Sequence, residues 1–245
     1  MTKDVHFIMQ GKGGVGKTLV SVLLTQYLKS HDRNVLCIDT DAVNRSFYRF
    51  KTFDVKIIPL LQQQEIDSTQ FDVMVEQIFN TECDSVVIDS GASTFIPLNK
   101  YIKECELVRI LLESDCMPYF HTILSGGSDS DDTLTGVVGL LDTFGKNEYR
   151  PRIAIWHNPH NGSIEWKGKT FSETKVYDSY KEFIDYQIIM PVLDKQLYGK
   201  DLELLLKNGQ TFDESRQDAS IRLMAKHRIN TMQKKFYDAI QQAGF

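Results

Sequence analysis

The chain has 245 residues, of which 42% are hydrophobic and 25% are charged, and its formal net charge is −5. This length and composition suit a single globular domain spanning 1–245, and they exclude a disordered or fibrous chain. The acidic balance disfavours a domain that coats nucleic acid. The four cysteines show no C-x-x-C spacing, which predicts reduced thiols. The first apolar run, 5–9, is too short for a signal-peptide core or a membrane span, so we expect a cytoplasmic protein.

Apolar runs rich in β-branched residues predict strands that are buried on both faces. They are found at 5–9, 35–38, 86–88, 119–124, 153–156 and 187–190. Apolar residues at helical spacing lie between these runs and predict helices over 18–30, 97–112, 133–144 and 181–184. This alternation predicts an α/β fold of the doubly wound type, a mostly parallel sheet with helices on both faces.

One long irregular segment, 157–171, contains two glycines and mixed charges. We interpret it as an insertion, and its polar character together with Trp166 and Phe171 predicts contacts with a protein partner. His157 and His160 lie in this segment without a supporting cysteine or carboxylate pattern, so they do not predict a metal site. The acidic run 128–132 precedes a predicted helix and is interpreted as an N-cap with an acidic first turn.

A phosphate-binding loop is predicted where G-x-x-x-x-G-K-[ST] follows the first strand and opens a helix. Its glycines permit positive φ angles and a close backbone approach, so that successive N–H groups point at phosphate oxygens. Lys17 would neutralise phosphate charge, and the hydroxyl of Thr18 would bind Mg²⁺ directly. The predicted nucleotide contacts are Gly11, Gly13, Gly14, Val15, Gly16, Lys17 and Thr18.

A second lysine in this loop, Lys12, makes the run K-G-G-V-G-K-T. The run resembles the deviant Walker A motif of the ParA/MinD family of dimeric P-loop ATPases. The resemblance implies ATP and Mg²⁺ as cofactors, slow hydrolysis and a nucleotide-dependent homodimer. It also implies a catalytic role for Lys17, and a role for Lys12 at the phosphates of the other subunit's nucleotide. A solvated lysine at the loop tip is the alternative interpretation.

Carboxylates end two further predicted strands, at the edge where doubly wound folds bind ligands. The resemblance implies that Asp39 and Asp89 lie near Mg²⁺ through water, and that Asp41 positions or activates the attacking water. Many family members have a proline after the Asp-Ser pair at 89–90, where this sequence has Gly91. A turn or an N-cap is the alternative role for any one strand-end aspartate.

Base contacts in the family come from an asparagine that ends a late strand and from a following strand that ends in proline. The matching positions are Asn158 and Pro191. Asparagine is also a common loop residue, which leaves a structural role open.

The whole chain also resembles the TraL family of plasmid conjugative-transfer regions, over residues from near the start to about 205. One departure is Ala42, where relatives often carry proline. The supporting runs are V-H-F-I-M-Q-G-K-G-G-V-G-K-T, L-C-I-D-T-D-A-V-N, V-V-I-D-S-G-A-S-T-F-I-P-L, H-T-I-L-S-G-G, W-H-N-P-H-N-G-S-I-E and L-Y-G-K-D-L.

The C-terminal stretch carries apolar residues at helical spacing with basic residues beside them. MinD proteins dock on membranes through a terminal amphipathic helix, but packing on the core explains the pattern equally well and is the interpretation we favour. The apolar residues are Ile221, Met224, Ile229, Met232, Phe236 and Ile240.

The sequence thus predicts an ATP-Mg²⁺-dependent dimeric switch and ATP hydrolase of the ParA/MinD type that acts in plasmid conjugative transfer. Its partner would be a conjugation or plasmid-maintenance protein. The alternatives are a nucleotide-dependent DNA-binding partition protein, and a metabolic enzyme on the same scaffold such as a ligase or an iron–sulfur reductase. The unpatterned cysteines disfavour the reductase. Contacts with DNA or a membrane are possible functions that the sequence does not favour.

Overall fold

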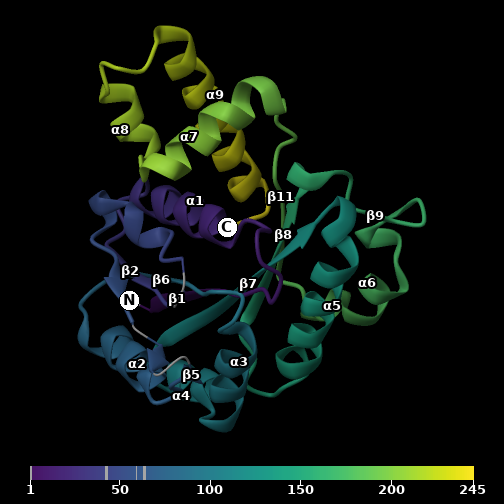
Figure 1. Ribbon diagram of the computed structural model, residues 1–245. Helices are drawn as coiled ribbons and strands as arrows, with labels where there is room; N and C mark the ends of the chain where they lie inside the picture. The colour runs from purple at the N-terminus through teal and green to yellow at the C-terminus, as the bar shows by residue number, and fades with distance from the viewer. Residues whose placement is uncertain (1, 42–43, 59, 63–64) are drawn as a thin grey trace.

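A seven-stranded parallel sheet forms the centre of the computed structural model, which describes residues 2–41, 44–58, 60–62 and 65–245 (Figure 1). Each of the six predicted strands is present in it, so the predicted α/β fold is confirmed. The strands in spatial order are β11 (Tyr186–Ile189), β8 (Arg152–Asn158), β7 (Cys116–Ser125), β1 (Lys3–Ile8), β6 (Ser85–Asp89), β2 (Val35–Asp39) and β3 (Lys56–Ile57).

Helices cover both faces of the sheet because successive side chains of each buried strand point to opposite sides. In β1, Phe7 packs into the apolar cluster on one face and Ile8 into that on the other. One face carries α1 (Lys17–Lys29), α7 (Lys200–Asn208), α8 (Phe212–Gln217) and α9 (Leu223–Gln242) (Figure 1). The other carries α2 (Gln70–Asn80), α3 (Phe95–Glu104), α4 (Leu107–Glu113), α5 (Ser130–Leu140) and α6 (Lys175–Tyr180).

The single helix predicted over 97–112 is wrong, because the chain forms α3 and α4 with a break between them. Glu106 adopts a left-handed backbone conformation, with φ at 49°. The break turns the chain so that Leu107 and Leu111, which lie off the predicted stripe, become buried. Cys105, which the continuous pattern placed in the core, is exposed instead.

Other helical predictions are partly correct. The segment 133–144 is α5 continued by a π-helical turn over Leu141–Gly145, and 181–184 contains only a 3₁₀ turn over Lys181–Phe183. Helices α2, α6, α7 and α8 were not predicted.

The segment 157–171 is more ordered than the sequence suggested. His157 and Asn158 end β8, and β9 (Glu165–Trp166) pairs with β10 (Lys169–Thr170) in a short antiparallel hairpin. Phe171 is buried against the edges of the His157 and Tyr177 rings. Phe171 therefore belongs to the core and is unsuited to contact a partner. A second small pair joins β4 (Leu61–Gln62) and β5 (Glu65–Ile66).

The apolar stripe of α9 packs on the core, as favoured from the sequence, since Ile229, Met232, Phe236 and Ile240 are all buried. Met224, in the first turn, is exposed. Across the described ranges, we find no helix whose length and apolar character would let it cross a membrane.

Strand β1 lies between β6 and β7: the chain passes from β1 to β2 on one side, and from β6 it later crosses β1 to β7 on the other side. Open α/β sheets bind ligands in the crevice outside the carboxyl ends of their strands, at such a switch in strand order. The loop that joins β1 to α1 starts at this point.

Candidate functional site

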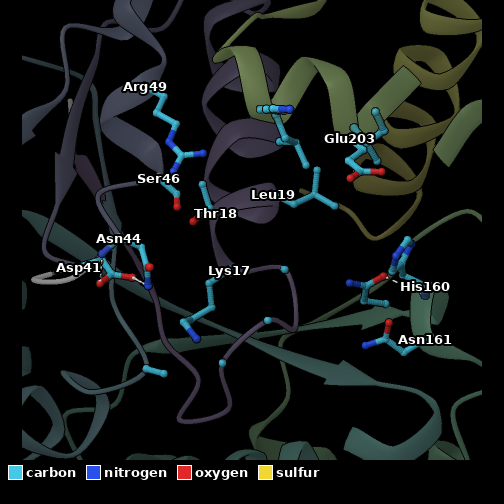
Figure 2. Close-up of a pocket in the computed structure, with 18 of the residues that line it drawn as sticks. Lys17, Thr18, Leu19, Asp41, Asn44, Ser46, Arg49, His160, Asn161 and Glu203 are labelled. Carbon is cyan, nitrogen blue, oxygen red and sulfur yellow. Dashed lines mark hydrogen bonds between the residues drawn. The ribbon is translucent and has the colours of Figure 1, made fainter. Parts of the chain in front are cut away.

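A pocket of about 800 Å³ opens at the carboxyl ends of the strands (Figure 2). The predicted site residues that line it are Gly13, Gly14, Gly16, Lys17, Thr18, Asp41 and Asn158. The predicted residues outside its lining are Gly11, Lys12, Val15, Asp39, Asp89 and Pro191. The pocket therefore unites residues from three separate segments of the chain.

The loop between β1 and α1 uses its glycines in different ways. Gly14 and Gly16 adopt the positive φ angles that glycine permits, 76° and 102°, whereas Gly11 and Gly13 do not. At Gly11 a Cβ would lie 3.1 Å from the ring of Phe95, and at Gly13 it would meet open space. Gly11 thus permits packing behind the loop, while Gly13 leaves its front accessible. The side chain of Val15 is buried, which leaves only its backbone for a ligand.

Lys17 closes the loop from inside. Its ammonium donates a hydrogen bond to the carbonyl oxygen of Lys12 at 2.8 Å. Burial lowers the pKa of Lys17, and the negative charges of Asp89 and Asp41 partly oppose that shift. A buried cation at the start of a helix, where backbone N–H groups also point outward, is suited to bind phosphate.

Asp89 is held at the base of α1. Its carboxylate accepts hydrogen bonds from the hydroxyls of Thr18 and Ser21, at 2.7 and 2.9 Å. Burial raises the pKa of Asp89 to about 7, and the neighbouring charge of Asp39 acts in the same direction. Without a compensating cation, this site therefore favours the protonated form of Asp89 below about pH 7.

Asp39 lies opposite Asp89 in the paired register of β2 and β6. Its carboxylate accepts hydrogen bonds from the backbone nitrogens of Asp41 and Tyr48, at 2.9 and 3.0 Å. Burial raises its pKa, which these backbone donors partly offset. Asp39 therefore organises the loop after β2, which agrees with the turn role that the sequence left open as an alternative.

The donors around Thr18 fit a magnesium ion that arrives with phosphates. The hydroxyl of Thr18 and the buried carboxylates of Asp39 and Asp89 offer oxygen atoms of the kind that Mg²⁺ prefers. The pKa values of both carboxylates are raised, so a nearby cation would stabilise their ionised forms. No group of three or more His, Cys, Asp or Glu side chains that could hold a metal occurs among the residues the structure describes. Magnesium commonly takes one or two protein ligands and completes its shell with phosphate and water, which matches this arrangement.

Asp41, which lines the pocket, lies close to Gly91. The Asp41 carboxylate accepts hydrogen bonds from the backbone and the side chain of Asn44, at 3.0 and 3.3 Å. A Cβ at Gly91 would lie 3.0 Å from the Asp41 carboxyl carbon, so a side chain there would displace Asp41. The absence of a side chain at Gly91 thus leaves room for the Asp41 carboxylate. Ala42 lies outside the described residues.

Lys12 points away from the pocket towards the start of α5. Its ammonium lies 2.8 Å from Asp132 and 3.3 Å from Asp129, and its side chain is 36% exposed. The acidic first turn predicted for α5 is confirmed, but no side chain caps the helix. These acids instead hold the lysine of the phosphate loop.

Two loops beside Lys12 fit together through glycines. A Cβ at Gly126 would lie 2.0 Å from the carbonyl oxygen of Gly162, and one at Gly127 would lie 2.4 Å from that of Asn161. This contact places the Asn161 amide 3.1 Å from Asp129. It gives a physical reason for the glycines in the runs H-T-I-L-S-G-G and W-H-N-P-H-N-G.

Asn158 links the far end of the pocket to the phosphate loop. Its amide nitrogen donates to the carbonyl of Val15 at 2.9 Å, and its amide oxygen accepts from the backbone nitrogen of His160 at 3.1 Å. Pro191 lines an adjoining cavity of about 80 Å³, which also includes Leu19 and Asn158. Apolar side chains such as Met190 and Val192 line this cavity beside the amide of Asn158. His157 is buried nearby, and burial lowers its pKa to about 4.

Sequence reasoning missed one wall of the pocket. Arg49 comes from the 3₁₀ turn η1 (Phe47–Arg49), while Glu203 and Lys207 come from α7. Neither element was predicted. For α7, the leucines at 202, 205 and 206 carried a helical signal that could have placed Glu203 and Lys207 together.

Comparisons with known proteins agree with this geometry. The model of the CobQ/CobB/MinD/ParA nucleotide binding domain matches residues 6–242. Protein TraL of Escherichia coli is 34% identical over 239 residues, which cover 98% of each chain. Among solved structures, the MinD cell division protein of Aquifex aeolicus is similar in fold, with a TM-score of 0.51 and 18% identity over 99% of this chain and 98% of that one. The MinC:MinD complex from the same organism gives a TM-score of 0.52, with 18% identity, 99% coverage of this chain and 96% of that chain.

The family model matches nearly the whole chain, and Protein TraL is 34% identical over 98% of each chain. Together these matches assign the sequence to a family. The phosphate loop, the strand-end aspartates and the pocket are consistent with that placement. The chain belongs to the CobQ/CobB/MinD/ParA nucleotide-binding family, and within it is a homologue of the TraL proteins.

Proposed function

We propose that this protein is an ATP-Mg²⁺-dependent switch ATPase that works as a homodimer in plasmid conjugative transfer. The observation that carries the proposal is that Lys17, Thr18 and Asp41 line one pocket, with Asp89 hydrogen-bonded to Thr18 behind its lining. These groups provide one cation, one hydroxyl and two carboxylates for a polyphosphate and its metal. The resemblance to the TraL proteins supports the role in conjugation.

Each predicted residue has a defined task in this proposal. Lys17 neutralises charge on the β- and γ-phosphates, and Asp41 orients the attacking water. Thr18 would hold Mg²⁺ directly, with Asp39 and Asp89 reached through water, and the ion would supply further charge neutralisation. Asn158 and Pro191 would contact the purine.

Lys12 supports the dimeric part of the proposal. It lies outside the pocket of its own subunit, on the exposed tip of the loop, and its bonds with Asp129 and Asp132 are surface ion pairs. Such pairs contribute little in water, so the lysine can exchange them for phosphate oxygens of a second subunit. A closed dimer would then present a new surface to a conjugation or plasmid-maintenance protein.

Direct measurement of nucleotide binding tests the proposal. The wild-type protein should bind ATP-Mg²⁺ and release phosphate slowly, and Lys17→Ala should weaken binding at least about tenfold, because a charge-assisted contact is lost. Lys29→Ala, at the exposed end of the same helix, is the matched control and should bind normally. A wild-type protein that does not bind ATP, or a Lys17→Ala variant with unchanged affinity, would overturn the assignment.

A further inference from the structure

The outer wall of the pocket carries charges that the proposed function leaves unused. Arg49, from the η1 turn, and Lys207, from α7, both line the pocket. Within the described ranges, Arg49 forms no ion pair and no side-chain hydrogen bond. An unpaired guanidinium at the edge of a phosphate pocket is a donor that is available for a ligand.

The segment that carries Arg49 is firmly anchored, although the side chain itself is exposed. Phe47, Phe50 and Phe53 are buried, and the last two rings stack with centroids 5.5 Å apart. The hydroxyl of Thr52 donates a hydrogen bond to Glu214 of α8. The chain therefore presents Arg49 from a fixed turn, which lowers the entropy cost of ordering it on a ligand.

Helix α7 also fixes the position of this turn. Gly209, the C-cap that follows α7, adopts a left-handed conformation with φ at 61°, and a Cβ there would lie 2.3 Å from the carbonyl oxygen of Arg49. Only glycine satisfies both conditions, because other residues would be strained and would also clash. The end of α7, with Lys207, and the turn with Arg49 are thus held against each other.

Figure 2 places Arg49 beside Ser46 and on the same side of the pocket as Thr18, whereas Lys17 extends away on the other side of Thr18. Glu203, the acid of this wall, lies beyond Leu19 and above His160, towards the base end. In a phosphate loop the lysine reaches the β- and γ-phosphates, so the region beyond Thr18 faces the α-phosphate. The position of Arg49 matches that end of the chain of phosphates.

We propose that Arg49 is a nucleotide ligand that contacts the α-phosphate from the η1 turn, on the Thr18 side of the pocket. This inference rests on the proposed nucleotide-binding function. The planar guanidinium can donate two hydrogen bonds to one phosphate, and Lys207 adds positive charge to the same wall. Arg49 thereby acts on every nucleotide that keeps an α-phosphate, and its contribution is independent of the γ-phosphate.

The test compares ADP and ATP affinity, each with Mg²⁺, for the full chain. Arg49→Ala should weaken both nucleotides by the same factor, about tenfold, because one charge-assisted contact is lost. Arg49→Lys should recover part of the affinity, since it keeps the charge without the planar fork. Lys51→Ala removes a positive charge two residues away, outside the pocket, and should leave both affinities unchanged.

Two outcomes would overturn the proposal. The first is equal affinity of Arg49→Ala and Lys51→Ala, and the second is a loss for ATP alone, which would place Arg49 at the γ-phosphate. Thermal unfolding without nucleotide should be unchanged by Arg49→Ala, because the side chain is exposed. Failure of the proposed function is a distinct result, in which the wild-type protein binds neither nucleotide.

Discussion

The ammonium of Lys12 lies 2.8 Å from the carboxylate of Asp132, so the first lysine of the phosphate loop is paired within its own subunit. Asp129 adds a second contact at 3.3 Å, and Asn161, which lines the pocket, binds Asp129 in turn. A lysine held in this way must leave both acids before it can contact another subunit. The acidic start of α5 would therefore compete with the proposed dimer for Lys12.

This competition predicts opposite effects for the two sides of the pair. Asp129→Asn combined with Asp132→Asn should let the ATP-bound protein dimerise at several-fold lower concentration, because Lys12 is released. Lys12→Ala should keep ATP affinity within about twofold and lose dimerisation. Sedimentation velocity with ATP-Mg²⁺ measures both changes, and Asp131→Asn in the same helical turn controls for loss of charge. An identical dimerisation curve for the double variant and the wild type would contradict the competition.

Asp89 should make the nucleotide-free protein less stable as pH rises. Its pKa is raised to about 7 when folded, against an ordinary value of 3.8, so the folded state binds the extra proton between these values. The free energy of unfolding that this group contributes is present below about pH 4 and is lost as pH rises through 7. Asp89→Asn removes the titrating group and with it this decrease in the free energy of unfolding at higher pH.

Urea unfolding at pH 5 and pH 8 checks this expectation. The variant should gain stability relative to the wild type at pH 8, and the gain should be smaller at pH 5. It should also bind ATP-Mg²⁺ at least about tenfold more weakly, because a charged partner of the metal site is lost. A stability difference that is the same at both pH values would show that the charge of Asp89 is not the cause.

A buried pair of histidines predicts acid sensitivity elsewhere in the molecule. The Trp156 indole donates to His121 at 2.9 Å, which makes that ring nitrogen an acceptor and leaves the other one to donate to His6 at 3.1 Å. Both rings are therefore neutral. Burial lowers the pKa of His121 to about 3 and also lowers that of His6.

The unfolded chain takes up protons at these histidines near pH 6.5, while the folded chain does not. The free energy of unfolding should therefore fall as pH drops below 6.5, by roughly 1 kcal/mol per histidine at pH 5.5. His121→Gln keeps an acceptor for Trp156 and removes one titrating group. The free energy of unfolding of this variant should therefore fall less between pH 7.5 and 5.5 than that of the wild type. Denaturant titration at the two pH values tests this, and equal losses would exclude His121 as a source.

The β9–β10 hairpin should carry contacts with the protein partner. Its exposed lysines, Lys167 and Lys169, project from the molecule, while Phe171 behind them is buried. Lys167→Ala with Lys169→Ala should leave ATP affinity unchanged and lower the frequency of conjugation about tenfold, through loss of charge complementarity. Lys146→Ala, on another loop, should have no effect. Normal transfer by the double variant would remove the hairpin from the partner surface.

The sequence predicted the parts of this molecule whose signals are local. Apolar, β-branched runs such as 86–88 predict buried strands. The spacing of Gly11, Lys17 and Thr18 predicts the phosphate loop. The break at Glu106 was missed because a left-handed turn leaves no regular pattern, and only packing of Leu107 and Leu111 requires it.

The wall of the pocket that carries Arg49 and Lys207 was also missed because no local pattern marks it. Arg49 and Lys207 are separated by 158 positions along the chain, and neither belongs to a motif. Their proximity depends on Gly209 fitting against the backbone of Arg49, which is a tertiary contact. The pairing of Lys12 with Asp132 likewise depends on how α5 approaches the loop.

The hydrogen bond from Asn158 to the carbonyl of Val15 ties the two ends of the nucleotide pocket to one another. A purine that competes for this amide would loosen the phosphate loop, and a base that leaves the amide in place would find the loop already set. Recognition of the base would then change how rigidly the phosphate loop is held around the phosphates. Selectivity among purines can thus be expressed in how quickly a nucleotide leaves, even where the phosphate contacts are identical.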